Sequence, residues 1–255
     1  MTTISLADPL TTLGLRATAI GLDDLVARAT KHRWSPTQLL EHLAAAEQED
    51  RARRGLERRL ARARLGRFKP MADFDWAWPK RLDRDAVEAA LRLDFLAEAR
   101  NLVLIANQGL GKTMIAQNIG HQAVLAGHSV LFVTASQLLL DLAAQDSARG
   151  LDRRLRHYGT RTSLLIVDEI GYLSYDTRNA DLLFQVIARR HEKKSLILTT
   201  NLAFSDWPTI FPNAGSAIAL IDRIVHHADI ISLEGESYRR RVAEQTLTKR
   251  RAAKA

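Results

Sequence analysis

The 255-residue chain contains no cysteine, which excludes disulfide bonds, thiolate metal sites and a cysteine nucleophile. Long apolar runs are missing too: LLIV at 164–167 is far shorter than the roughly 20 residues that a membrane-spanning helix needs. The opening residues, MTTISLADPL, lack the basic start and apolar run of a secretory signal. We therefore expect a soluble, intracellular protein with no membrane partner.

Acidic residues are fewer than basic ones. Lysine and arginine total 37 against 29 aspartate and glutamate residues, so the formal net charge is +8. Such an excess favours an anionic partner, and nucleic acid is the usual one, although a basic charge can also serve solubility alone. The apolar content of 46% and the length allow one α/β domain with a smaller second domain.

Composition changes along the chain predict three segments. Residues 1–72 are rich in Ala, Leu and Arg and favour helices, with a helix after Gly21 and another that begins at Ser35-Pro36. Residues 73–248 start with a Trp-containing connector and an amphipathic helix. Residues 249–255 form a basic tail.

Short apolar segments alternate with helical patterns in the second segment. This alternation predicts an α/β domain whose mostly parallel sheet is covered by helices. The expected strands lie at 102–106, 130–135, 164–168, 195–201 and 230–233.

The stretch LIANQGLGKT at 104–113 is similar to a phosphate-binding loop. It follows an expected strand and precedes an expected helix, which is the context that such a loop requires. Its backbone N–H groups would face the β-phosphate, Lys112 would reach the β- and γ-phosphates, and the Thr113 hydroxyl would ligate Mg²⁺. The predicted nucleotide-binding residues of this segment are Ala106, Asn107, Gln108, Gly109, Leu110, Gly111, Lys112, Thr113 and Met114.

Ala106 stands where the loop pattern has its first glycine. A methyl group is tolerable there if φ is negative and costly if φ is positive. The alternative is a degenerate loop that binds no nucleotide.

A second motif, LLIVDE at 164–169, ends an apolar strand in two acids. We expect Asp168 to hold the Mg²⁺ shell and Glu169 to orient and activate the attacking water. Asn201 ends the next strand, SLILTTN, and is a candidate partner of the γ-phosphate or the water, although alone it is an ordinary turn residue.

Arg223 lies in ALIDRIVHHADII at 219–231, on an expected helix with buried apolar neighbours. It is either a solvated side chain or an arginine finger that completes the site of a neighbouring subunit. The adjacent His226 and His227 would point in different directions on a helix. We expect no metal site there, because no acid lies at ligand spacing in the sequence.

The segment 51–69, interrupted by Gly55, carries nine basic residues and a single acid, Glu57. Helices that serve only solubility usually mix charges of both signs, so DNA phosphate binding is the favoured interpretation over a merely solvated surface. The predicted DNA-binding residues are Arg51, Arg53, Arg54, Arg58, Arg59, Arg62, Arg64, Arg67 and Lys69. For Phe74, Trp76 and Trp78 we favour packing between the two domains over contact with adenine or with DNA bases.

An ordered set of motifs resembles the IstB-type transposition helper ATPases of insertion sequences, which are related to the DnaC helicase loaders within the AAA+ class. These motifs are ADFDWAW, LDFLAEARN, GLGKT, LLIVDEIGYL, SLILTTNLAFSDW, LIDRIVHHADII and GESYRRR. The resemblance as a whole extends from about residue 5 to residue 245. The set in this order is specific, whereas each motif alone is not.

The resemblance implies a five-stranded parallel AAA+ P-loop ATPase core behind an N-terminal all-helical domain. It implies ATP and Mg²⁺ as cofactors, an ATP-dependent homo-oligomer on duplex DNA, and a partner transposase of the same element in the bacterial cytoplasm. Asp168, Glu169, Asn201 and Arg223 match the family's magnesium-holding acid, catalytic acid, first sensor and arginine finger. Arg239 is a candidate second sensor.

Three other functions remain open. A helicase loader would share the ATPase core and differ in the N-terminal domain. A small-molecule kinase would need an acceptor pocket, and a scaffold without hydrolysis would have lost ATP through the altered loop.

Overall fold

The computed structural model describes residues 6–172 and 174–241, which divide into two compact units. The first unit ends at Arg58 and the second starts at Arg59, so the division falls within helix α4 (Pro36–Ala63). The expected basic tail at 249–255 lies outside the described residues.

The first unit consists of helices. They are α1 (Ala7–Thr12), α2 (Arg16–Ile20), α3 (Leu22–His32) and the first part of α4. The Ser35 hydroxyl accepts from the Gln38 N–H at 3.2 Å, and Gln38 Oε1 accepts from the Ser35 N–H at 2.8 Å, which is a reciprocal cap at the start of α4. Buried Glu47 accepts from the N–H of Thr18 at 2.8 Å and so ties α2 to α4.

The run at 51–69, expected to be broken by glycine, is continuous at Gly55, because α4 continues through it to Ala63; the helix ends before Gly66, which has φ of +67°. Glycine weakens a helix interior by only about 1 kcal/mol relative to alanine, and the surrounding Arg, Leu, Glu and Ala residues favour helix.

The second unit alternates strands and helices, with α4 ending in it. Its elements are η1 (Met71–Asp73), β1 (Arg81–Leu82), α5 (Arg84–Arg92), α6 (Asp94–Ala97), β2 (Asn101–Ala106), α7 (Lys112–Leu125), β3 (Val130–Thr134), α8 (Ala135–Ala143), α9 (Ala148–Gly159), β4 (Leu164–Ile170), α10 (Thr177–Arg190), β5 (Ser195–Thr200), η2 (Phe204–Thr209), α11 (Ala214–Val225) and β6 (Ala228–Glu234).

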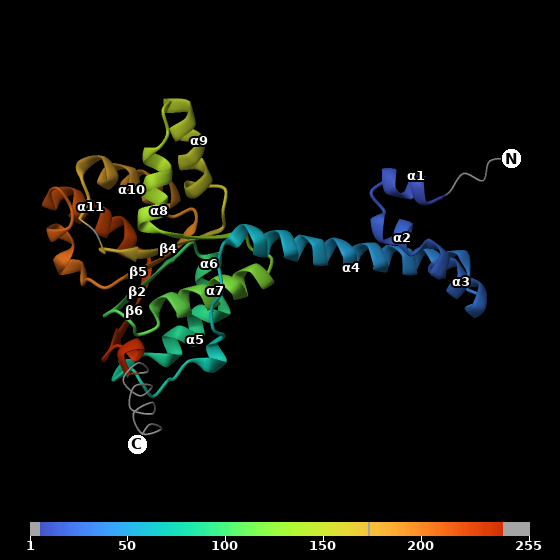
Figure 1. The fold of residues 1–255 in the computed structure, drawn as a ribbon, viewed down its shortest axis with the longest axis horizontal. Coiled ribbons are helices and arrows are strands. Elements are labelled where there is room, and N and C mark those ends of the chain that lie inside the picture. Colours follow the sequence, from blue (N-terminus) through green and yellow to red (C-terminus); the bar gives the residue numbers. More distant parts are fainter. Residues whose placement is uncertain (1–5, 173, 242–255) are drawn as a thin grey trace, which may run out of the picture. The chain divides into compact units, whose positions relative to one another are not determined.

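The strands form one sheet in the order β1-β6-β2-β5-β4-β3. Strands β2 to β6 run parallel, as expected, and α8, α10 and α11 lie on one side of the sheet while α5 and α7 lie on the other (Figure 1). Helices on both faces explain why these strands are apolar throughout and why every residue of β5 is buried.

The expected count of five strands is corrected to six in the described residues. The added strand, β1, has only two residues, and it pairs antiparallel with β6 through Arg81 opposite Glu234 and Leu82 opposite Leu233. A pair this short has no apolar run of its own, so the sequence pattern did not indicate it.

The strand order brings residues from distant parts of the chain together at two edges of the sheet. Because the strands are parallel, the carboxyl ends of β2, β5 and β4 share one edge of the sheet, where ligands bind in open α/β folds. The amino ends of β6, β2 and β5 share the opposite edge. None of the helices within the described residues combines the length and apolar character needed to cross a membrane.

Candidate active site

Ala106 is the last residue of β2, where it pairs with Leu233 of β6 and is buried. Its φ is not positive, whereas Gly109 and Gly111 have φ of +80° and +98°. The left-handed backbone that favours glycine is therefore needed at these two positions and not at Ala106. A methyl group on Ala106 is compatible with the loop.

Two neighbouring segments pack closely on the loop. A Cβ atom on Gly111 would lie 2.7 Å from the Phe74 ring, and one on Gly109 would collide with the Ser237 hydroxyl. The N–H of Tyr238 also donates to the carbonyl of Gly109 at 3.0 Å. The glycines thus permit both the loop conformation and the close approach of the connector and of the segment after β6.

Lys112 begins helix α7, and its ammonium group donates to the carbonyls of Ala106 at 2.6 Å and Asn107 at 3.0 Å. The pKa of Lys112 is lowered overall, chiefly because the ammonium group is buried. The carboxylates of Asp168 and Glu169 oppose this pKa shift, and the nearby Arg239 adds to it. A desolvated cation beside a second cation gains strongly from an anionic ligand, so the loop is arranged for phosphate.

Asp168 is buried at the carboxyl end of β4. Its two carboxylate oxygens lie 3.1 and 3.0 Å from the Thr113 hydroxyl, which donates to them, and the Thr199 hydroxyl of β5 also donates to this carboxylate. A hydroxyl beside a fixed carboxylate is an all-oxygen donor set of the kind that Mg²⁺ prefers. Thr113 and Asp168 therefore fit the predicted magnesium ion.

Glu169 differs from its neighbour in exposure, because β4 is irregular between Val167 and Ile170 where it pairs with β5. Glu169 has φ of +64°, its side chain is exposed, and its N–H donates to the Thr199 hydroxyl at 2.9 Å. Of these two neighbouring acids, Asp168 is therefore buried and Glu169 is exposed to solvent. Asn201 directly follows β5 at the same edge of the sheet.

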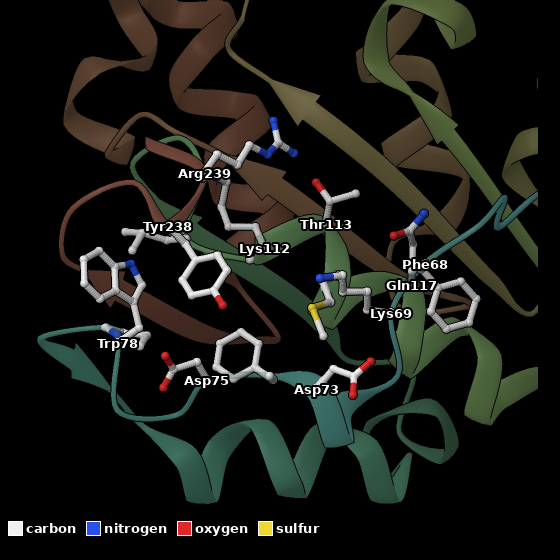
Figure 2. A pocket seen from close by; sticks show the side chains of 16 residues that line it. Phe68, Lys69, Asp73, Asp75, Trp78, Lys112, Thr113, Gln117, Tyr238 and Arg239 are labelled. Atoms are coloured by element: carbon white, nitrogen blue, oxygen red, sulfur yellow. The ribbon is translucent and has the colours of Figure 1, made fainter. Parts of the chain in front are cut away.

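A cavity of about 340 Å³ adjoins the loop. Figure 2 shows Lys112, Thr113 and Arg239 on one side of it and Asp73 and Asp75 on the other. Its size is at the lower end of the range for small-molecule sites. The aromatic residues Phe68, Phe74, Trp78 and Tyr238 and the polar Lys69 and Gln117 also line it, together with Met114 of the predicted segment.

The cavity corrects the favoured interpretation of the connector aromatics. Phe74 and Trp78 are half-buried in the cavity wall, and Trp76 packs edge-on against Phe74 with Arg84 over its ring. Asp73, Gln117 and Tyr238 line the cavity but were not among the predicted site residues. Asp73 belongs to the ADFDWAW motif and Tyr238 to the GESYRRR motif, and these motifs were the available signals.

The other residues of the predicted loop take different positions. Asn107 and Gln108 are exposed, whereas Leu110 is buried. Two consecutive side chains of the turn thus face solvent, and the next non-glycine side chain packs inward.

Arg223 lies near the end of α11, and its guanidinium group stacks over the Phe184 ring at 4.5 Å and donates to the Ala219 carbonyl at 3.2 Å. Since α11 leads into the amino end of β6, Arg223 is at the opposite edge of the sheet from Ala106. The structure brings Lys112, Thr113, Asp168, Glu169 and Asn201 together and leaves Arg223 apart from them.

The nine basic residues at 51–69 have different surroundings. Arg53 is paired with Asp50 at 2.6 Å and Glu57 at 2.9 Å, and Arg54 with Asp50 at 2.6 Å. Arg59 donates to the Val124 carbonyl at 3.3 Å, and Lys69 lines the cavity. The side chains that remain exposed outside these contacts are Arg51, Arg58, Arg62, Arg64 and Arg67.

Comparison with known proteins identifies relatives across nearly the whole chain. The family model for IstB-like ATP binding proteins matches residues 9–246. An ATP-binding protein of insertion sequence IS21 from Pseudomonas aeruginosa is 36% identical over 218 residues, which cover 86% of this chain and 82% of that protein. One from insertion sequence IS5376 of Geobacillus stearothermophilus is 35% identical over 213 residues, with 84% of each chain covered.

The fold of the second unit also resembles a solved structure. The DnaC helicase loader superposes with a TM-score of 0.50 at 18% identity, covering 64% of this chain and 97% of that one. At this identity the likeness concerns the fold, and it agrees with the expected AAA+ type of core.

We expect Ala106→Gly to bind ATP within about twofold of the unchanged protein, because Ala106 lies in the strand and has no need of glycine's conformational freedom. Gly111→Ala is expected to lose at least about tenfold in affinity, since φ of +98° is strained for alanine and its methyl group would meet Phe74. Calorimetric titration with ATP and magnesium measures both. A large gain for Ala106→Gly would mean that the loop is impaired, and no binding by either chain would support the scaffold alternative.

Proposed function

The chain is an ATPase of the IstB-like ATP binding protein family, and we propose that it assembles on duplex DNA as an ATP-dependent homo-oligomer. In this proposal the assembly assists the partner transposase of the same insertion sequence. The relatives whose names place them in insertion sequences match both units of the chain, and the basic segment offers contacts for DNA phosphates.

The nucleotide is proposed to lie along the loop. Backbone N–H groups and Lys112 would bind its phosphates, and the adenosine part would enter the adjoining cavity between Phe74, Trp78 and Tyr238. An adenine ring stacks favourably on aromatic side chains, and Asp73 and Asp75 can accept hydrogen bonds from its ribose or amino group. When bound, magnesium at Thr113 and Asp168 would neutralise phosphate charge.

The other roles in hydrolysis are proposed for Glu169, Asn201 and Arg239. Glu169 is exposed at the strand end, so its carboxylate is free to orient a water molecule and to take its proton. Asn201, at the end of the neighbouring strand, would hold the γ-phosphate or that water. Arg239, beside Lys112, is proposed to sense the nucleotide from the segment after β6.

The observation that carries the proposed assembly is the position of Arg223. An arginine that stabilises transition-state charge must reach the γ-phosphate, yet Arg223 lies at the opposite edge of its own sheet. A second copy of the chain, arranged head to tail, can supply it. Such heterologous contacts build rings or helical filaments.

A mixing experiment tests this arrangement. Lys112→Ala should abolish hydrolysis in its own site but still supply Arg223 to the neighbouring site. Arg223→Ala should keep an intact nucleotide site of its own but supply no arginine to the site of its neighbour. Each protein alone is expected to be inactive. An equimolar mixture should regain about a quarter of the activity of the unchanged protein, since random assembly pairs an intact site with an intact finger at that frequency. Phosphate release with DNA present measures it, and absence of recovery would contradict a shared site.

The basic segment predicts a salt-dependent, sequence-independent affinity for DNA. Arg51 and Arg58 are exposed and seven residues apart on α4, so they share one helix face. The double variant Arg51→Ala/Arg58→Ala should reduce the slope of log affinity against log salt by about 2, because each lost phosphate contact removes about 0.9. Fluorescence anisotropy with a duplex in ATP gives the slope.

The matched control is Arg81→Ala/Arg84→Ala, which removes the same charge from two residues paired with Glu234 and Glu88. Its slope should stay unchanged. Equal loss in both double variants would mean that only the net charge matters, and the basic segment would have no specific role.

The likeness of the second unit to the DnaC helicase loader raises loading of a replicative helicase as the second candidate. This likeness covers 64% of this chain, whereas the family match covers residues 9–246 and so includes the helical first unit. We therefore expect the immobilised full chain, with duplex DNA and ATP, to retain the element's transposase in a pull-down. Retention of the replicative helicase in the absence of DNA, without the transposase, would favour the loader.

A further inference from the structure

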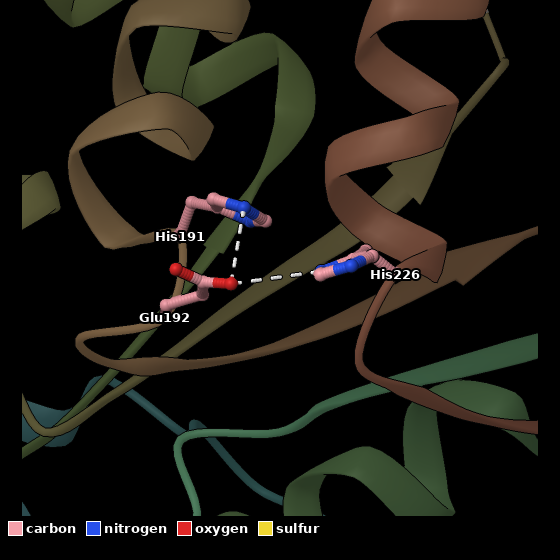
Figure 3. A group of neighbouring side chains, drawn as sticks. All are labelled: His191, Glu192 and His226. Carbon is pink, nitrogen blue, oxygen red and sulfur yellow. Dashed lines mark ion pairs between the residues drawn. The ribbon is translucent and has the colours of Figure 1, made fainter.

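Two histidines and a glutamate meet at the amino edge of the sheet, away from the nucleotide site. His191 and Glu192 follow α10 in the turn before β5, and His226 follows α11 in the turn before β6. One ligand atom from each lies within 4.8 Å of those of the other two (Figure 3). The strand order explains the meeting, because β5 and β6 flank β2 and start at the same edge.

The spacing of these atoms suits a shared cation. Glu192 Oε1 lies 3.9 Å from His191 Nε2 and 3.6 Å from His226 Nδ1, which is too long for ordinary hydrogen bonds. Two ligands of a tetrahedral zinc ion, each bonded at about 2.0–2.1 Å, lie about 3.4 Å apart. The two distances to Glu192 Oε1 are therefore within a few tenths of an ångström of that spacing.

The orientation of His191 supports the same conclusion. Its Nδ1 lies 3.2 Å from the backbone carbonyl of Arg223, and a carbonyl can only accept a hydrogen bond. Nδ1 is therefore the protonated nitrogen, and the lone pair of Nε2 faces Glu192. A carbonyl that fixes the far nitrogen in this way is the usual support of a metal-binding histidine.

Buried side chains hold the two turns in place. Asn101, at the start of β2, donates from Nδ2 to the Ile224 carbonyl at 3.0 Å and accepts at Oδ1 from the Leu196 N–H at 3.2 Å. Its N–H donates to the His227 carbonyl at 2.7 Å. The Asn101 side chain thus connects the end of α11 to the start of β5. These hydrogen bonds fix the two turns that carry the ligands.

The turn after α10 has a second buried support. The Arg190 guanidinium group donates to the carbonyls of Tyr158 at 2.8 Å, Ser163 at 3.0 Å and Ser195 at 2.6 Å, and burial lowers its pKa to about 9. It remains charged at neutral pH and fixes the turn between α10 and β5. Glu192 has φ of +57° in this turn, a conformation that glutamate rarely adopts.

We propose that His191, Glu192 and His226 bind a divalent transition-metal ion, with zinc as the best match to two imidazoles and a carboxylate. The ligands are partly exposed, so the ion can enter from solvent and a water can take the fourth position. His227 Nε2 lies 3.6 Å from the same glutamate oxygen. The ion would join the turn after α10 to the end of α11, the helix that carries Arg223.

Zinc titration of the untagged, metal-free full chain tests the proposal, without nucleotide and with excess magnesium to occupy oxygen-only sites. We expect one zinc ion per chain by calorimetry. At zinc concentrations about 100-fold above the dissociation constant, the melting temperature should rise by roughly 5 °C.

His191→Asn keeps a donor toward the Arg223 carbonyl but removes Nε2, and Glu192→Gln keeps the shape but removes the charge. Each should weaken zinc binding at least about tenfold while melting like the unchanged chain in chelator. His128→Asn, at a half-buried histidine after α7, is the matched control and should bind zinc normally.

Unchanged zinc affinity in both ligand variants, or no binding by the unchanged chain, would overturn the proposal. If one of the two ligand variants fails to fold, the zinc affinity of the other variant decides the test. Because the measurement uses neither ATP nor DNA, its failure leaves the proposed ATPase function untouched, and failure of that function leaves the zinc site untouched.

Discussion

The parallel pairing of β2, β5 and β4 is the constraint on which the site depends. Three strands that run in one direction end together, so residues from three distant parts of the chain meet at one edge. The Thr199 hydroxyl joins two of these strands directly, since it donates to the Asp168 carboxylate and accepts from the Glu169 N–H. The two acids are thereby held in different environments although they are neighbours in sequence.

The same constraint acts at the opposite edge. The amino ends of β6, β2 and β5 bring together the turns that precede them, and Asn101 fastens these turns to each other. Arg223 and the His191, Glu192 and His226 cluster therefore belong to one structural region, separate from the phosphate loop.

Local patterns predicted much of the fold and of the nucleotide site. The five parallel strands were expected within one or two residues of their observed ends. Short, continuous apolar runs between helices are typical of buried parallel strands, which is why they could be predicted. The loop, Lys112, Thr113 and Asp168 were identifiable because their spacing and their positions at strand ends are local properties. The strand β1 and the continuity of α4 through Gly55 were missed, since a two-residue pair and a tolerated glycine leave no clear pattern.

The sequence by itself determined the α/β class, the candidates for phosphate binding and the excess of basic charge, because each of these depends on residue type and spacing alone. Only the tertiary structure decided that Ala106 needs no glycine, that Phe74 and Trp78 line the cavity, and that Glu192 lies beside His191 and His226. Backbone angles, cavity walls and ligand clusters depend on which strands become neighbours. That order arises from long-range pairing, which no local spacing encodes.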